Sequence, residues 1–170
     1  MPCTEAVALQ QDFTEFLEEK DKMRIFSAKA CDLPPKALLL RYQDGNYTDC
    51  FAVEIAGAPD LATCIAAFYT SWLFKAERAV LKVLANAPST DAEAVALGRG
   101  EASHFSVWTT EDRTETQLLM CPSDKRTRSW FMVSPGSHAT TFYFGSALLV
   151  NGRPQTGLLL RTIIAFHRAY

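Results

Sequence analysis

The chain has 170 residues, of which 48% are hydrophobic and 21% are charged, and this ordinary globular composition argues against disorder. The length predicts a single domain over residues 1–170, with an N-terminal helical region over 1–46 and a sheet-and-helix region over 47–170. A formal net charge of -2 argues against a protein built to bind nucleic acid, because such a protein usually carries a basic face.

The cysteines and the hydropathy pattern indicate a cellular compartment. Five cysteines at irregular spacing, with no C-x-x-C pair, are typical of reduced thiols in a cytosol. The first residues lack the basic and apolar regions of a signal peptide. The longest apolar stretch, Leu61–Ala85, contains Lys75, Glu77, Arg78 and Lys82, which would be costly within a bilayer. We therefore expect a cytoplasmic protein with no membrane span.

The first half of the chain is predicted to combine helices with one strand. Glu5–Arg24 has roughly helical apolar spacing, whereas Lys36–Gln43 is too short to distinguish a helix from a strand. Tyr47–Ile55 alternates apolar residues with a period of two, which predicts a strand. Asp60 can cap a following helix, and the apolar stripe of Leu61–Ala85 predicts that this helix is long and amphipathic.

The second half carries the clearest pattern. Asn86–Gly100 is small and polar, which predicts a linker or a mobile flap. Four β-type runs follow, separated by short polar turns that include Glu111-Asp112: His104–Thr110, Arg113–Cys121, Arg126–Ser134 and Ala139–Val150. Gly157–Tyr170 is apolar and is predicted to be a helix. The fold class is therefore predicted as α+β, with a curved antiparallel meander of five or six strands packed against helices mainly on one face.

Both faces of the central strands are predicted to be apolar. A period of two places Arg128, Trp130 and Met132 on one face, and Phe131 and Val133 on the other. A simple open sheet would have one wet face, so something is expected to cover each side. One cover is expected to be a long helix, and the other the N-terminal helix, a partner subunit or a ligand.

One of these faces is graded from charged to aromatic, and such a mixture suits a small-molecule pocket. In this reading Arg128 pairs with a carboxylate or phosphate of the ligand, while aromatic rings supply contact area. The alternative is that Arg128 extends into solvent and the aromatic residues are ordinary core. The candidate ligand-binding residues are His104, Trp108, Arg128, Trp130 and Tyr143.

The sequence contains no nucleophile elbow, no glycine-rich dinucleotide motif and no phosphate loop. Its histidines lack the spacing of a helical metal pair, so we expect neither a metal nor a cofactor. An enzyme of hydrolase or cyclase type is an alternative, with His104 as general base and Asp49 or Glu101 orienting it. A homodimer that uses the second apolar sheet face is a further alternative.

Several aromatic segments resemble an uncharacterised bacterial family of small domains of unknown function, within the START-like or helix-grip superfamily: Tyr47–Phe51, His104–Trp108, Arg126–Phe131, Thr141–Ser146 and Phe166–Arg168. The resemblance covers roughly residues 47–170. It implies a curved antiparallel sheet around a long helix, with an apolar ligand cavity. Because Gly157–Tyr170 is short for a gripping helix, we expect Leu61–Ala85 to take that role. The leading hypothesis is therefore a non-catalytic module that binds a small apolar or amphipathic molecule.

Overall fold

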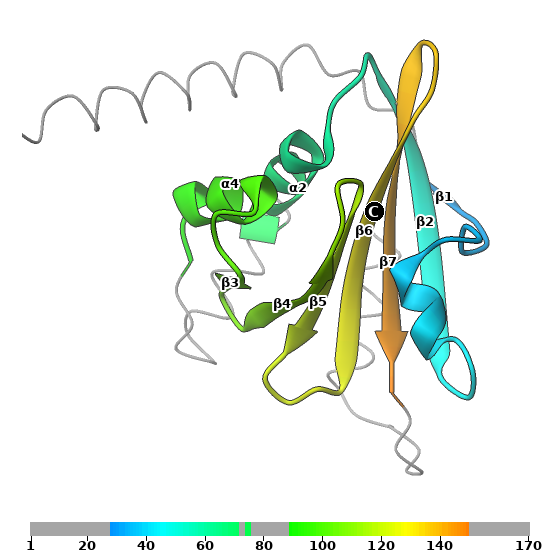
Figure 1. Cartoon of the computed structure of the whole chain (residues 1–170), viewed down its shortest axis with the longest axis vertical. Coiled ribbons are helices and arrows are strands. Elements are labelled where there is room, and N and C mark those ends of the chain that lie inside the picture. Colours follow the sequence, from blue (N-terminus) through cyan, green and yellow to red (C-terminus); the bar gives the residue numbers. More distant parts are fainter. Residues whose placement is uncertain (1–27, 72–73, 76–88, 150–170) are drawn as a thin grey trace, which may run out of the picture.

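The computed structural model of the chain describes residues 28–71, 74–75 and 89–149. The strands among them form one seven-stranded antiparallel sheet in the order β1-β2-β7-β6-β5-β4-β3 (Figure 1). Helices α2 (Leu61–Tyr69) and α4 (Asp91–Arg99) lie side by side against one face, and the 3-10 helix η1 (Leu38–Tyr42) packs on the other. The predicted α+β class with a curved antiparallel sheet is confirmed.

The antiparallel meander is also confirmed, although the strands at the two edges of the sheet differ from the prediction. The strands are β1 (Lys29–Ala30), β2 (Tyr47–Ala56), β3 (His104–Phe105), β4 (Trp108–Arg113), β5 (Gln117–Pro122), β6 (Thr127–Pro135) and β7 (Ala139–Leu148). Each strand from β3 to β7 pairs with the next, and β2 pairs with β7 along its whole length. Strand β1 was not predicted, because two residues are too few to show a period.

The predicted strand His104–Thr110 is instead a hairpin of two strands. Ser106 has a φ of 54°, and the chain reverses there, so that Phe105 pairs with Trp108. The predicted turn at Glu111-Asp112 is also wrong, because both residues lie inside β4, where the register against β5 shifts. Such a shift is a β-bulge, which re-aims side chains without ending the strand.

Helix α2 begins where the sequence predicted and ends earlier. The carboxylate of Asp60 accepts a hydrogen bond from the Thr63 N–H at 2.8 Å, which confirms the predicted N-cap. The helix stops at Thr70, whose hydroxyl donates to the Ala66 carbonyl at 2.8 Å. Ser71 Oγ then accepts from the Phe74 N–H at 3.3 Å. The predicted helix Leu61–Ala85 is therefore interrupted at Thr70 and Ser71, and Phe74 and Lys75 are again helical. Residues 72–73 and 76–85 lie outside the described residues, as do the predicted N-terminal and C-terminal helices.

Helix α4 replaces most of the predicted linker. Thr90 and Glu93 form a capping box, in which each side chain accepts a hydrogen bond from the other's backbone N–H. Gly100 ends the helix with a φ of 77°, a left-handed conformation that favours glycine. No helix in the described part of the chain is long and apolar enough to cross a membrane.

Two hydrophobic cores lie on opposite faces of the sheet. The core under α2 and α4 contains large side chains from both the helices and the sheet, among them Tyr69, Phe105 and Phe131. The core under η1 is smaller and contains Leu39 and Trp130. The prediction that both faces are covered is therefore confirmed, and the segment 33–42 is the described cover of the second face.

Gly145 in β7 allows η1 to lie close to the sheet. A Cβ atom at this position would lie 3.0 Å from Leu39 Cδ2, 3.0 Å from Trp130 Cε3 and 2.8 Å from the Asp49 carbonyl oxygen. Trp130 is opposite Gly145 in the register of β6 and β7, so the indole ring lies over the space that a side chain would fill. The absence of a side chain at Gly145 is thus part of how the second core packs.

We expect Gly145→Ala to lower the free energy of unfolding by about 1–3 kcal/mol, because the added methyl group forces Leu39, Trp130 or the Asp49 backbone to move. Urea denaturation followed by tryptophan fluorescence measures this change. Thr141→Ala, on the same strand and face, is the control, and should cost no more than about 1 kcal/mol. An unchanged unfolding midpoint in Gly145→Ala would contradict the close approach.

Candidate functional site

Three of the five predicted ligand-binding residues meet on the η1 face of the sheet. Arg128 and Trp130 lie on β6, and Tyr143 lies on the neighbouring strand β7. The ring centroids of Trp130 and Tyr143 are 6.3 Å apart. Trp130 is fully buried and Arg128 is 7% exposed, so these residues belong to the packed interior of this face.

The other two residues lie apart from this group. Trp108 packs in the opposite core, with its ring centroid 6.2 Å from that of Phe74. His104 is exposed on the edge strand β3, and its Nδ1 lies 3.2 Å from Thr109 Oγ1. A single strand over His104–Thr110 would place His104 and Trp108 on one face, but the hairpin pairs Trp108 with Phe105 and His104 with Thr109. Adjacent cross-strand pairs point to opposite faces.

The Arg128 guanidinium is already engaged within the protein. Its Nε lies 2.5 Å from Glu111 Oε2, and its Nη1 donates to the carbonyls of Lys125 and Thr127 at 3.0 and 2.8 Å. The guanidinium carbon also lies 4.6 Å from the centroid of the Tyr42 ring, a cation–π distance. A ligand carboxylate would have to displace Glu111 and leave that carboxylate without its cation.

Tyr42 joins η1 to the same group. Its hydroxyl donates a hydrogen bond to Glu111, so one carboxylate binds both the phenol and Arg128. Burial, followed by the hydrogen bond with Glu111, raises the pKa of Tyr42 above its usual value. Glu111 reaches both partners from the bulge in β4, the segment that the sequence predicted as a turn.

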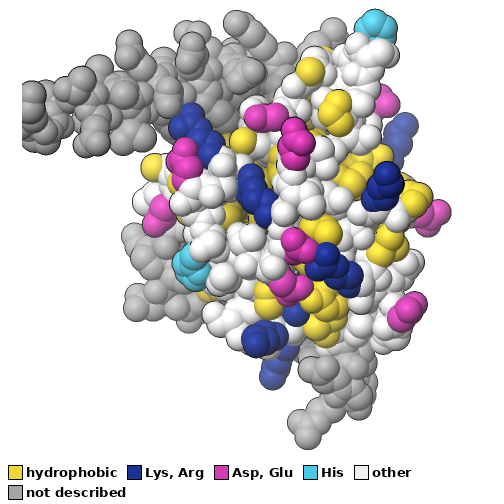
Figure 2. Space-filling model, viewed as in Figure 1, with side chains coloured by type: hydrophobic (Ala, Val, Ile, Leu, Met, Phe, Trp, Pro, Cys, Tyr) yellow, Lys and Arg dark blue, Asp and Glu magenta, His cyan; other side chains and the backbone are white. Residues whose placement is uncertain are grey.

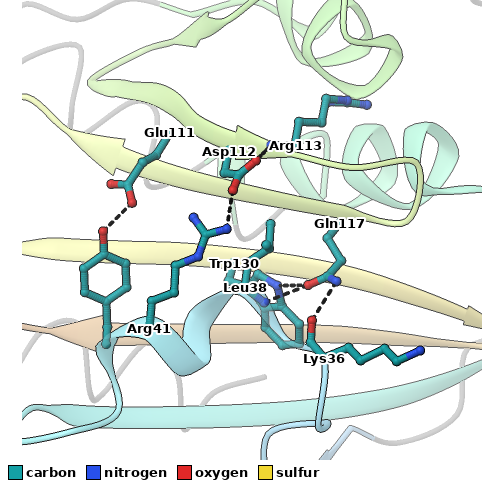
Figure 3. A network of polar contacts seen from close by, with 9 residues as sticks. Lys36, Leu38, Arg41, Glu111, Asp112, Arg113, Gln117 and Trp130 are labelled. Atoms are coloured by element: carbon teal, nitrogen blue, oxygen red, sulfur yellow. Dashed lines mark hydrogen bonds and ion pairs between the residues drawn. The ribbon is translucent and has the colours of Figure 1, made fainter.

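Gln117 connects the segment before η1 to the second core, and sequence reasoning did not identify it. Its Oε1 accepts from Trp130 Nε1 and from the Leu38 N–H, each at 2.9 Å, and its Nε2 donates to the Lys36 carbonyl at 3.0 Å (Figure 3). Gln117 is 8% exposed, so these groups have little access to water as an alternative partner. A glutamine at the start of a strand carries no sequence signal for this role.

A second ion pair reinforces the attachment of η1. Arg41 Nη2 lies 2.5 Å from Asp112 Oδ2, beside the contact between Tyr42 and Glu111 (Figure 3). Both side chains are partly exposed, so the pair contributes little by itself. Figure 2 shows acidic and basic side chains interspersed over this side of the molecule, with hydrophobic side chains between them.

The residues of the predicted acid–base alternative do not come together. Asp49 lies on β2, where its Oδ1 accepts from the Ser146 N–H at 2.9 Å and from the Ser146 hydroxyl at 2.6 Å. His104 lies on β3, at the other end of the strand order. Five strand spacings separate the two strands, or about 24 Å. Asp49 therefore cannot orient His104. Glu101, the other predicted partner, is exposed just beyond α4.

The described residues also contain an apolar opening, on the opposite face of the sheet from Arg128. It has a volume of about 80 Å³ and lies between β2, β7 and α2. Every residue that lines it is alanine, valine or phenylalanine: Ala28, Phe51, Ala52, Val53, Phe68, Phe142 and Phe144. Among the described residues, no group of three histidine, cysteine or acidic side chains is placed to hold a metal ion.

Phe68 forms the helical wall of this opening. Its ring centroid lies 5.0 Å from those of Phe131 and Phe144 and 6.4 Å from that of Phe142. On the sheet side, Phe51 pairs with Phe144 and Val53 pairs with Phe142 across β2 and β7. Strand pairing and aromatic packing thus hold the side chains around the opening in place, and neither depends on a bound ligand.

Gln117→Ala is expected to lower the free energy of unfolding by about 2–4 kcal/mol, because it leaves the buried N–H groups of Trp130 and Leu38 without an acceptor. Gln117→Glu should also destabilise the fold, because a carboxylate at this buried position loses its hydration and places an oxygen against the Lys36 carbonyl. Denaturation followed by tryptophan fluorescence measures both. Gln43→Ala, at an exposed position, serves as the control. Equal stability of Gln117→Ala and Gln43→Ala would rule out this role of Gln117.

In comparisons with known proteins, no family model, no curated protein and no solved structure matches this chain. The resemblance to the START-like superfamily therefore stays a prediction, and the site is defined by the geometry of its own residues.

Proposed function

We propose that the protein is a non-catalytic module that binds a small, mostly apolar or amphipathic molecule between the sheet and α2. The observation that carries this proposal is the opening lined by Phe51, Val53, Phe68, Phe142 and Phe144. Small-molecule sites are concave and mostly apolar, and they are commonly formed before the ligand arrives. This opening has these properties, at the junction of sheet and helix that the helix-grip resemblance implied.

The size of the opening limits the ligand. At about 80 Å³ it is well below the roughly 300–1,000 Å³ of pockets for drug-sized molecules. It would therefore hold one part of an elongated molecule, such as the end of an alkyl or acyl chain, with the remainder outside. Burial of each CH₂ group contributes about 0.8 kcal/mol, so affinity should increase with the length of chain that is buried.

The chemistry of the lining favours the uncharged part of such a molecule. The seven lining side chains offer neither a charge nor a polar group, so a carboxylate placed among them would lose its hydration without compensation. A polar head group would then stay at the mouth of the opening. This arrangement differs from the pairing of a ligand carboxylate with Arg128 that the sequence predicted, because Arg128 is occupied by Glu111 on the other face.

Neither alternative has comparable support. The enzyme hypothesis needed His104 beside a carboxylate, whereas the hydrogen bond of its Nδ1 is with the Thr109 hydroxyl. The homodimer hypothesis rested on an uncovered second apolar face, and η1 covers that face in the described part of the chain. Ligand binding in the opening is therefore the function that the geometry favours.

Two opposite substitutions at Val53 test the proposal. Val53→Phe fills the opening and should weaken binding of a fluorescent fatty-acid probe at least tenfold, whereas Val53→Ala enlarges it and should preserve or strengthen binding. Either change can destabilise the fold to a similar extent. A general loss of stability would weaken binding in both variants, so it cannot explain a loss confined to Val53→Phe. Fluorescence titration measures the affinities, and equal affinities for the two variants would contradict the proposed site.

Native mass spectrometry of freshly purified protein provides the second measurement. We expect an adduct of small mass that is present in the parent chain and depleted in Val53→Phe. A dimeric mass without any adduct, together with no saturable probe binding, would overturn the proposal and favour the homodimer.

A further inference from the structure

Two cysteines lie against each other at the β1 edge of the sheet. Cys31 Sγ and Cys50 Sγ are 3.5 Å apart, although 19 positions separate the residues in the sequence. Cys31 directly follows β1 and Cys50 lies in β2, and the Cys31 N–H donates to the Cys50 carbonyl at 3.0 Å. The irregular spacing of the cysteines in the sequence carries no signal for this pair.

The backbone at this pair suits a disulfide. Lys29 pairs with Ala52 and Ala30 with Phe51, so the next pair in the same register is Cys31 with Cys50. In a hydrogen-bonded antiparallel pair the Cα atoms are about 5.5 Å apart, within the range that disulfides span. The sulfur atoms need to approach only from 3.5 Å to about 2.0 Å, which rotation of the side chains and a small strand movement supply.

The two thiols differ in access, and this difference assigns their roles. Cys31 is exposed, whereas Cys50 is 4% exposed in the core under η1. Burial, followed by the hydrogen bond with Cys31, raises the pKa of the Cys50 thiol above its usual range. Oxidation by a molecule in solution favours an accessible sulfur, so Cys31 reacts first. Cys50 is then positioned to react with the oxidised Cys31.

We propose that Cys31 and Cys50 form a reversible redox-modification site, which a peroxide converts into a disulfide between β1 and β2. The Cys31 sulfur attacks the peroxide O–O bond and becomes a sulfenic acid, and one water is released when the oxidant is hydrogen peroxide. The Cys50 sulfur then attacks that sulfur, forming the S–S bond and releasing the second water. Together the thiols lose two protons and two electrons, and a dithiol reductant reverses the reaction.

The disulfide would fasten one of the two shortest strands of the described sheet to one of its longest strands. Strand β1 has two residues and β2 has ten. Only a few backbone hydrogen bonds can form over so short a strand, so its separation from the sheet is a low-energy local opening. A covalent bond at this point would suppress that opening. This inference does not depend on the proposed ligand.

Mass spectrometry of the oxidised full chain tests the site directly. The chain carries Cys64→Ala, because Cys64 would otherwise share a tryptic peptide with Cys50. After treatment with equimolar hydrogen peroxide, alkylation of the remaining thiols and trypsin digestion, we expect the peptide Ala30–Lys36 linked to Tyr42–Lys75. Dithiothreitol should abolish the link.

Thermal unfolding gives an independent readout. The oxidised chain should unfold at a Tm higher than that of the reduced chain by on the order of 5–10 °C, because the bond closes a loop of about 20 residues in the unfolded state. This shift should disappear in Cys31→Ser and persist in Cys121→Ser, the control for a partly exposed cysteine. The proposal is overturned if Cys50 can still be alkylated after the peroxide treatment. In that case Cys31 has resisted oxidation, has formed a sulfinic acid or has paired with another cysteine.

Discussion

A sheet with two apolar faces is stable in water only when both faces are covered, and this constraint organises the described structure. Along β6, Trp130 points to one core and Phe131 to the other, so no rotation or shift of the strand could place all apolar side chains on one side. Helices α2 and α4 cover one face, whereas the short segment 33–42 covers the other. That segment is also attached to the sheet by polar contacts with Gln117, Glu111 and Asp112.

The parts of the fold that could be predicted are those whose signals are local. Strands β2, β6 and β7 alternate with a period of two and end at turn residues, so their predicted positions are nearly correct. Helix α4 was missed because its composition is small and polar, although Thr90, Glu93 and Gly100 carried capping signals that could have identified it. The acidic pair Glu111-Asp112 in β4 has the composition of a turn, and no local signal reveals its partners, which lie about seventy positions earlier in the chain and on β6.

The candidate site was harder to predict than the fold, for a physical reason. Arginine, tryptophan and tyrosine on neighbouring strands give the same sequence pattern whether their side chains contact a ligand or one another. Only the positions of Glu111 and Gln117 distinguish these cases, because they determine whether Arg128 and Trp130 already have partners. The apolar opening on the opposite face depends in turn on where α2 crosses β2 and β7, which no short stretch of sequence encodes.

The pairing of β2 with β7 has a consequence for how the chain folds. Each hairpin from β3 to β7 forms between neighbours in the sequence, so it closes only a short loop. Asp49 and Ser146, by contrast, meet across 97 positions, and the chain between them contains both described α-helices. The entropy lost in closing this large loop is recovered only once the helices and β2 pack together. The apolar face between β2, β7 and α2 therefore forms only when β2 pairs with β7, and contacts between residues so far apart in the sequence are the slowest to form.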